Sequence, residues 1–101
     1  MRLVFTQEAL SDLSELRSCL IDRSPKALSS VVQQIESRIK AAMSNPNMGR
    51  PSPLLGVREL VEPKYGYVIP YALLQGNFHV LRVYHGSRKP LDYSELVLPF
   101  T

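Results

Sequence analysis

The sequence predicts an α+β fold in which a helical hairpin packs on one face of an antiparallel sheet. Apolar residues recur every three or four positions over residues 7–22 and again over residues 25–45, as on the buried side of an amphipathic helix. Strand-like segments follow from residue 57 onward, and one short strand-like segment, "RLVF", precedes the helices. The order strand, helix, helix, strand, strand, strand places both helices on one sheet face and leaves the other face free.

The first strand is predicted at Arg2–Phe5 and the first helix at Gln7–Asp22, with Thr6 as the helix N-cap. Four leucines lie on one side of this helix and are expected to face the core: Leu10, Leu13, Leu16 and Leu20. The single cysteine, Cys19, excludes an internal disulfide and is expected to be a buried thiol on the same side. The opposite side, which includes Asp12, is expected to be solvated.

A second helix is predicted from Pro25 to about Asn45. Ser24 can cap it, Pro25 suits its first turn, and Pro46 disfavours helical backbone in the residue before it. Its apolar side is continuous and comprises Leu28, Val31, Val32, Ile35, Ile39, Ala42 and Met43. The proline- and glycine-rich segment "NPNMGRPSPLLG" that follows is predicted to be a loop.

Three strands are predicted at Val57–Glu62, Tyr67–Gln75 and Phe78–His85, and "QGN" between the last two predicts a tight hairpin. Pro70 cannot donate to a hydrogen-bond ladder, so it favours a sheet edge or a bulge. The C-terminal segment "LDYSELVLPFT" fits either a helical turn or an extended tail.

Side-chain alternation assigns the faces of the last strand. Leu81 and Val83 would point into the core. The alternate residues of this strand would line the free face of the sheet. They are a valine, a cation and an aromatic residue: Val80, Arg82 and Tyr84.

The composition is that of a small globular domain. At 101 residues, 45% of them hydrophobic, the chain can form one core, so a single domain over residues 1–101 is expected. No apolar run reaches the length of about 18 residues that a membrane span needs, and the N-terminus lacks the pattern of a secretory signal. A cytoplasmic protein with no membrane association is therefore expected.

Positive charge gathers in the second half of the chain. The net charge is +3, and residues 50–89 hold two acidic residues, Glu59 and Glu62, against the basic residues Arg50, Arg58, Lys64, Arg82, Arg88 and Lys89. This distribution suits an acidic partner or a nucleic acid, and equally a basic surface without a partner. The two histidines, His79 and His85, have no third ligand at a recognisable spacing, so neither a metal nor a cofactor is expected.

Four segments carry a resemblance to a known family: "NPNMGRP", "GVRELV", "GYVIPYAL" and "VLRVYHGSRKP". With the element order, they resemble the RelE/ParE family of type II toxin–antitoxin systems, from the opening strand to about Pro90. The resemblance implies a small cytoplasmic toxin that is neutralised by an antitoxin encoded beside it. RelE-like members are ribosome-dependent ribonucleases that cut messenger RNA, whereas ParE-like members poison DNA gyrase by stabilising its cleaved-DNA complex. Both branches share one fold, so the fold does not separate them.

The residues favour the ParE-like branch of the family. RelE-like ribonucleases commonly carry an arginine after "GY", where this chain has Val68. RNA cleavage needs a general base, a general acid and cations for the phosphate, and the candidates for these roles are His85, Arg88 and Arg82. The "MGRP" loop and the "H-G-x-R" ending are closer to ParE-like toxins, so we expect binding to gyrase without catalysis. A ribosome-dependent mRNA interferase and a non-toxic partner-binding module remain as alternatives.

Some of these residues also have a purely structural interpretation. His85 can be a strand-terminal residue that positions the turn, and Gly86 is expected to supply a positive φ angle there. Arg82 can contact a target, pair with Glu59 or Glu62, or be a solvated surface arginine.

The resemblance implies two sets of binding residues. Contacts to the target are expected from Arg50, Arg58, Arg82, Tyr84, Arg88 and Lys89. The antitoxin is expected to be a partly disordered acidic segment that places an amphipathic helix in an apolar groove. Candidate residues of that groove lie at the flanks of the helices: Leu16, Leu20 and Met43.

Overall fold

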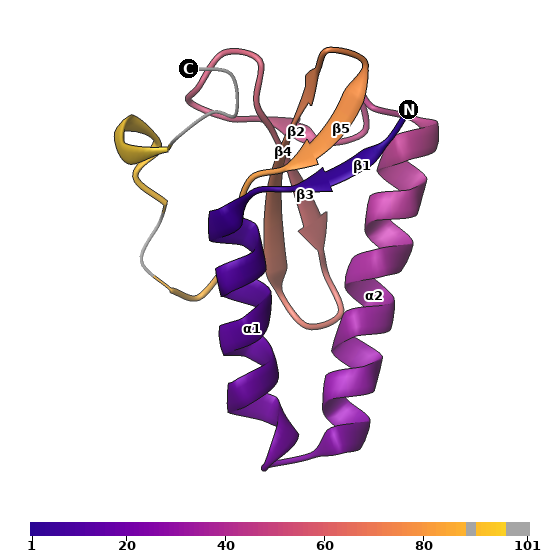
Figure 1. Cartoon of the computed structure of the whole chain (residues 1–101), viewed down its shortest axis with the longest axis vertical. Coiled ribbons are helices and arrows are strands. Elements are labelled where there is room, and N and C mark those ends of the chain that lie inside the picture. The colour runs from indigo at the N-terminus through magenta and orange to yellow at the C-terminus, as the bar shows by residue number, and fades with distance from the viewer. Residues whose placement is uncertain (89–90, 97–101) are drawn as a thin grey trace.

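The computed structural model of this protein describes residues 1–88 and 91–96. Strand β1 (Leu3–Phe5) leads into helices α1 (Gln7–Ile21) and α2 (Pro25–Ser44). The chain continues through β2 (Arg50–Pro51), β3 (Arg58–Glu62), β4 (Tyr67–Leu74), β5 (Asn77–Val80), β6 (Tyr84–His85) and the 3-10 turn η1 (Tyr93–Glu95). Figure 1 shows the two helices running in opposite directions along one side of the sheet. The predicted α+β class, with a helical hairpin on one sheet face, is confirmed.

Both helices begin at the N-caps that the sequence predicts. Thr6 Oγ1 accepts a hydrogen bond from Ala9 N at 3.1 Å, and Ser24 Oγ accepts one from Ala27 N at 3.1 Å. Each bond satisfies a backbone donor that the first helical turn leaves unpaired. Within the residues that the structure describes, no helix is both long and apolar enough to cross a membrane.

The sheet is mixed, with the strand order β1-β5-β4-β3-β2 and with β6 paired to β4. The β2–β3, β3–β4, β4–β5 and β4–β6 pairs are antiparallel. β1 pairs with β5 in parallel, with Leu3 beside Phe78. The prediction of a purely antiparallel sheet is wrong in this respect. The chain reaches β5 only after a long crossover through both helices, which permits parallel pairing.

The β4–β5 hairpin has the tight turn that "QGN" predicts. Gln75 and Gly76 have φ angles of 54° and 76°, and Leu74 pairs with Asn77 across them. A two-residue turn with two positive φ angles matches the twist of the flanking strands and sets their register.

A β-bulge interrupts the strand that follows this hairpin. Val80 pairs with Tyr71 and Tyr84 pairs with Val68, so three residues of one strand lie opposite two of the other. Pro70 is one of the two opposing residues on β4. Its carbonyl accepts a 2.9 Å bond from Leu81 N of the bulged strand, and its nitrogen carries no hydrogen to donate. The predicted last strand is therefore divided into β5 and β6, and the bulge that Pro70 favours is confirmed.

The bulge changes which side chains of this strand face the helices. Val80 and Val83 both lie in the main core, whereas Leu81 lies on the sheet face opposite the helices, which we call the far face. The expectation is confirmed for Val83 and wrong for Val80 and Leu81, because Val80 pairs with Tyr71 of the main core and its neighbour Leu81 therefore points to the other face. Val83 returns to the helix side because the extra residue of the bulge shifts the alternation by one position. Tyr84 lies on the far face, as expected.

The main core fills the space between the helices and the sheet. Its buried members are Ala9, Leu16, Val31, Ile35, Ile39, Ala42, Leu60, Ile69, Tyr71, Phe78, Val80 and Val83. Leu10 and Cys19, which were expected to be buried, are exposed. The buried side of α1 is centred on Ala9, which is fully buried, and successive helix positions are about 100° apart, so Leu10 is turned away from the core.

A second, smaller apolar cluster covers part of the far face. Val57, Ala72 and Leu81 are buried there, and the side chains packed against them are Leu54, Leu74, Tyr93 and Leu96. The α2–β3 connection and residues 91–96 thus fold over a face that was expected to be free. That expectation is wrong for this part of the sheet, because an open face would leave three apolar side chains in water. Residues 97–101 of the C-terminal segment lie outside the described residues.

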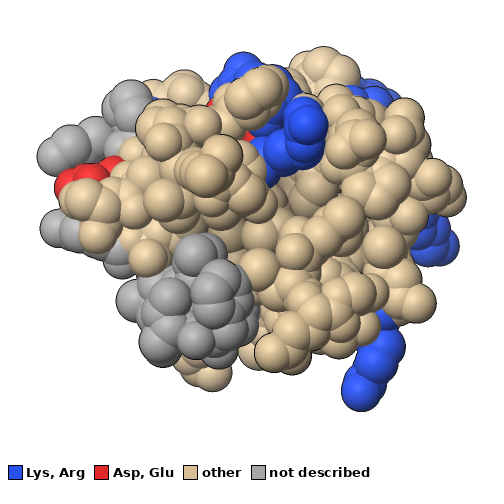
Figure 2. Space-filling model, turned by 90° about the horizontal axis from the view of Figure 1, so that it is seen from above, with Lys and Arg blue, Asp and Glu red and all other residues tan. Residues whose placement is uncertain are grey.

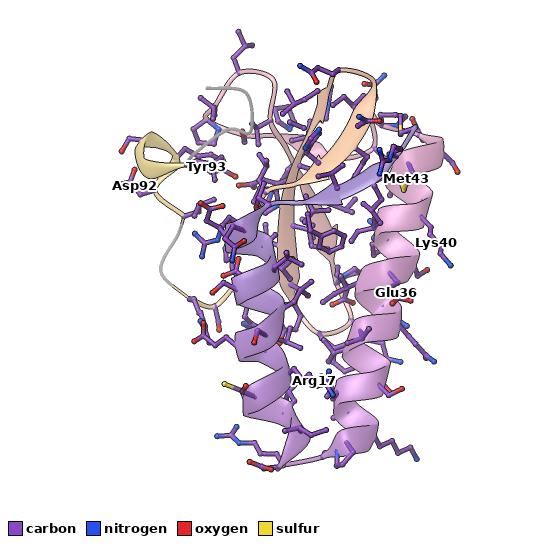
Figure 3. All side chains as sticks on the ribbon, viewed as in Figure 1. Arg17, Glu36, Lys40, Met43, Asp92 and Tyr93 are labelled. Carbon is purple, nitrogen blue, oxygen red and sulfur yellow. The ribbon has the colours of Figure 1, made fainter. Side chains whose placement is uncertain are left out.

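The packing of α2 gives a direct test of the fold. Ile35 is 3% exposed in the main core, so Ile35→Asp buries a carboxylate without a partner. That burial costs several kcal/mol, against a total stability of about 5–15 kcal/mol for a small domain. We expect the variant to be unfolded by circular dichroism at 25 °C. Glu36→Ala changes the exposed neighbour, which points away from the sheet in Figure 3, and should melt close to the parent protein.

Candidate functional site

A cleft of about 540 Å³ opens on the far face, beside β3 and β6 and next to the segment that carries η1. Part of its floor is apolar and comes from Val61 and Val68, a cross-strand pair of β3 and β4. Its charged and aromatic lining residues are Arg50, Glu59, Tyr84, Arg88 and Tyr93. We call this site the far-face cleft.

Glu59 lies at the centre of the polar contacts in the far-face cleft. Its carboxylate accepts a 2.7 Å bond from Arg50 Nε and a second bond from the Tyr93 hydroxyl. The Glu59 side chain is 11% exposed, whereas that of Arg50 is 58% exposed. Burial, and then the bond to Glu59, raise the pKa of the Tyr93 phenol above its ordinary value. Tyr93 is therefore a neutral hydrogen-bond donor at physiological pH, and Figure 3 shows it on the side of η1 nearer the sheet.

Tyr84 and Arg88 come from the other wall of the far-face cleft. Burial, and then the negative charge of Glu59, raise the pKa of Tyr84. Arg88 is 61% exposed and lies 3.8 Å from a Glu15 carboxylate that is equally exposed. Such a contact is weak in water, so the charge of Arg88 remains available to a ligand. The cleft therefore offers one open cation, one cation paired with a carboxylate, and two neutral phenols.

Basic side chains are scattered over one end of the molecule. Figure 2 shows the end of the molecule that is uppermost in Figure 1, where Lys and Arg form small separate groups on a mainly uncharged surface. Of the six predicted target contacts, the structure brings Arg50, Tyr84 and Arg88 together in the far-face cleft. Lys89 lies outside the described residues.

Arg82 does not lie on the far face. Its Nε and Nη2 donate to the two carboxylate oxygens of Asp12 on α1, at 2.7 and 3.1 Å. The bond that Arg82 donates to Asp12 raises the pKa of Arg82 above its ordinary value. The free-face assignment of Arg82, and its pairing with Glu59 or Glu62, are therefore wrong. Asp12, expected to be solvated, is 13% exposed and occupied by this ion pair.

Arg58 is separated from the far-face cleft as well. Its Nη1 donates to the carbonyl of Gly49 at 2.7 Å, and its side chain lines a different cleft beside the α2–β3 connection. Residues alternate between the two sheet faces along a strand, so Arg58 and Glu59 point to opposite faces of β3.

His85 faces α1 rather than the far-face cleft. Its ring lies edge-on to Tyr67, with the ring centroids 5.3 Å apart, and it lines a small cleft with residues of α1. Its Nδ1 accepts a 3.1 Å bond from Ser87 N and lies 2.6 Å from Ser87 Oγ. These contacts fit the interpretation of His85 as a residue that positions the turn.

The glycine beside His85 has a different role from the predicted one. Gly86 does not have a positive φ angle; in this region Gly66 does, at 85°. The Gly86 amide donates to the Gly66 carbonyl at 2.7 Å, and a Cβ on Gly86 would lie 3.1 Å from that oxygen. Close approach of two backbone segments, rather than a left-handed turn, is what favours glycine at position 86.

Sequence reasoning missed two members of the far-face cleft. Glu59 was considered only as a partner of Arg82, although its cross-strand neighbour in β2 is Arg50. The pairing of Arg50 with Glu59 depends on strand β2, which lies in a segment that the sequence predicts to be a loop. Tyr93 comes from the C-terminal segment, which carries no periodic pattern that would place it against β3.

The three residues predicted to contact an antitoxin lie along the helical hairpin. Leu16 is 9% exposed and belongs to the main core, whereas Leu20 and Met43 are partly buried at its margin. Leu20 is near the end of α1, and Figure 3 shows Met43 near the opposite end of the hairpin. A partner that touches both must therefore extend along most of the length of the hairpin.

Comparison with known proteins places this α+β fold among bacterial toxins. Residues 3–90 match the family described as the ParE toxin of the type II toxin–antitoxin system parDE. A protein of Sinorhizobium fredii named "Putative toxin Y4kP" is 31% identical over 88 residues, which is 87% of this chain and 91% of that protein. The chain belongs to the ParE toxin family, and the resemblance to RelE/ParE toxins inferred from the sequence is confirmed.

Solved structures show the same relationship. The chromosomal ParDE toxin–antitoxin system of P. aeruginosa includes a chain that is 28% identical, with a TM-score of 0.68, and the match covers 82% of this chain and 92% of that one. The isolated RelE toxin of E. coli is 14% identical, with a TM-score of 0.64 and coverage of 87% and 86%. The intact E. coli RelBE toxin–antitoxin complex matches at 14% identity, with a TM-score of 0.63 and coverage of 86% and 98%. At 14% identity, the RelE matches support the fold.

The contact between α1 and the bulge can be tested by Asp12→Asn. The substitution removes the negative charge that pairs with Arg82 and keeps the size of the side chain. We expect the free energy of unfolding to fall by about 1–2 kcal/mol, since charge-assisted bonds contribute more than neutral ones and Arg82 is partly exposed to water. Urea denaturation measures the change. Glu36→Gln removes an exposed charge of α2 and should change stability by less than about 0.5 kcal/mol; equal effects of the two variants would contradict the role of Asp12.

Proposed function

We propose that this protein is a ParE-like toxin that binds DNA gyrase, stabilises its cleaved-DNA complex in the cytoplasm, and is neutralised by an antitoxin. The family shown by the sequence is the ParE toxin family, and the chain shares 28% identity with a chain of the P. aeruginosa ParDE system. The E. coli RelE structures share the fold at half that identity.

The observation that carries the proposal is the chemistry of the far-face cleft. Proton transfer to and from an RNA backbone needs a group that can exchange a proton near neutral pH. The described lining residues include no histidine or lysine. Glu59 already accepts bonds from Arg50 and Tyr93, and raised pKa values keep both tyrosines of the cleft protonated. This set of groups supports binding rather than catalysis.

Two features of the same region support that interpretation. Val68 occupies the floor of the cleft, at the position where RelE-like ribonucleases commonly carry an arginine. This protein therefore has a weaker phosphate-binding site there than those enzymes have. His85 faces α1 and bonds to Ser87, so its Nδ1 is engaged away from the cleft.

A ribosome-dependent mRNA interferase is the second candidate function. Arg50 and Arg88 could hold a phosphate in the far-face cleft, and Tyr84 or Tyr93 could stack on a base. A family member that binds its partner without being toxic is a third candidate. Induced expression separates these functions, because gyrase poisoning causes a DNA damage response and filamentation, whereas an interferase arrests translation rapidly.

The helical hairpin is the proposed contact surface for the antitoxin. Leu20 and Met43 are partly exposed at the two ends of the hairpin, and Leu16 supports the surface from below. An amphipathic helix of an otherwise disordered segment could cover this length, since it gains order and buries its apolar side in the same step. A complex in which the antitoxin touches neither helix would contradict this assignment.

Arg88 is the open cation of the far-face cleft, so a change of its charge tests the target site. We expect Arg88→Glu to reduce gyrase binding at least about tenfold and to abolish toxicity, because arginines at interface centres often contribute that much or more. Binding can be measured with purified gyrase and toxicity by induced expression. Arg23→Glu reverses an exposed arginine at the far end of the hairpin and should retain both properties. Toxicity that survives Arg88→Glu would rule out the cleft as the target site.

His85→Gln separates binding from catalysis. Glutamine keeps a polar side chain of similar reach but cannot exchange a proton near neutral pH as an imidazole can. A gyrase poison should keep its toxicity, whereas an interferase that uses His85 should lose about a hundredfold or more of its cleavage rate. The measurements are cleaved-DNA complex formation with gyrase and cleavage of ribosome-bound messenger RNA. RNA cleavage by the parent protein that disappears in this variant would favour the second candidate.

A further inference from the structure

A second cleft, of about 290 Å³, lies between the α2–β3 connection and the end of β4. Its walls are largely apolar and include Pro46, Pro51, Leu54 and Leu73. Arg58 is the charged residue among the described residues that line it. Leu55 stands on the rim and is 98% exposed, and Leu73 is 45% exposed. We call this site the loop cleft.

The exposure of Leu55 is built into an ordered turn. Val57 N donates to the Leu54 carbonyl at 3.1 Å, and Ser52 Oγ lies 2.7 Å from the Val57 carbonyl and 3.0 Å from that of Leu54. Gly56 has a φ angle of 85°, which reverses the chain directly after Leu55. The turn therefore presents a large apolar side chain to water from an ordered backbone, so a partner that buries this side chain has little backbone order left to impose.

The base of the loop cleft is also held by specific contacts. The Tyr71 hydroxyl donates to the Pro46 carbonyl at 2.6 Å and accepts a bond from Gly49 N at 3.0 Å. A Cβ on Gly49 would lie 2.6 Å from that hydroxyl oxygen, so glycine permits the close approach. The cleft is thus part of the packed structure, preformed for a ligand.

The charge of Arg58 indicates what the loop cleft can accept. Its Nη1 donates to the Gly49 carbonyl, and a guanidinium has five N–H donors in all, so it can also hold a carboxylate. The described residues that line the cleft include no acidic side chain to supply one. A second copy of this chain would bring a second arginine with the same surface. The complementary occupant is a protein segment that carries an apolar side chain beside a carboxylate.

The short segment of residues 50–53 borders both the loop cleft and the far-face cleft. Arg50 and Pro53 line the far-face cleft, whereas Pro51 and Ser52, which lie between them in sequence, line the loop cleft. A protein large enough to cover the first cleft would therefore extend over this segment to the second.

We propose that the loop cleft and Leu55 form a second part of the surface that binds DNA gyrase, where gyrase presents an apolar side chain beside a carboxylate. This inference rests on the proposed function. It assigns Leu55 as the apolar anchor and Arg58 as its charged neighbour.

The test uses the purified toxin and purified DNA gyrase in a direct binding measurement. Leu55→Asp should lower the affinity at least about tenfold, since the apolar side chain loses its burial against gyrase and a carboxylate takes its place. Leu55→Met keeps an apolar side chain of similar size and should stay within about threefold of the parent protein. Leu10→Asp is the matched control on α1, where a leucine is 50% exposed on another surface, and it should bind as the parent does. All variants should have the melting temperature of the parent protein within a few degrees.

The role of Arg58 is tested by measuring how the affinity for gyrase depends on salt concentration. Arg58→Gln should lower the affinity about tenfold and reduce its dependence on salt, because screening acts on charge pairs. Arg58→Lys should recover part of both, since it keeps the charge without the planar guanidinium. A loss of affinity with unchanged salt dependence would contradict the carboxylate contact.

The outcomes separate the inference from the function on which it rests. If the parent protein does not bind gyrase, both fail. If the parent binds and Leu55→Asp binds equally well, the gyrase site excludes the loop cleft and only the inference fails. If Leu55→Asp keeps gyrase binding but loses binding to the antitoxin, or abolishes a dimer of the parent protein, the surface belongs to that other occupant and the inference is overturned.

Discussion

The contact between Asp12 and the β-bulge joins the helical hairpin to the end of the sheet that carries the far-face cleft. One Asp12 oxygen accepts bonds from Arg82 Nε at 2.7 Å and from Val83 N at 2.9 Å. The second of these donors is a backbone amide in the segment between β5 and β6, where the bulge interrupts the ladder opposite Pro70. Without an acceptor, that amide would be a buried donor without a partner. A single carboxylate on α1 therefore satisfies a backbone donor that the bulge leaves out of the ladder.

The position of β6 in turn determines the composition of the far-face cleft. Because the bulge shifts the alternation by one residue, Tyr84 faces the cleft and His85 faces α1. Arg82 lies on the helix side, in phase with Val80, and donates to Asp12. The site is left with two arginines and two tyrosines around Glu59. The chemical groups of this cleft thus depend on the register of one strand.

Glu59 is a second carboxylate that joins separate segments of the chain, here around the far-face cleft. It connects β3 to β2 through Arg50 and to the C-terminal segment through Tyr93. The same segment packs on Val57, Ala72 and Leu81, so apolar burial and a buried carboxylate act together to hold residues 91–96 against the far face. The β2–β3 region then separates two clefts, one with charged and aromatic groups and one that is mainly apolar. A protein target could engage both at once, which a single nucleotide could not do.

The sequence by itself determined the class of the fold, the two helices with their caps and the "QGN" turn, and it limited Pro70 to a sheet edge or a bulge, because each depends on local periodicity or on backbone chemistry at one residue. It also identified the family, and three of the residues that meet in the far-face cleft: Arg50, Tyr84 and Arg88. The faces of Val80, Leu81 and Arg82, the partner of Asp12 and the arrival of Tyr93 at Glu59 were decided only by the tertiary structure. These depend on strand register and on contacts between residues far apart in the chain, and no local pattern records them.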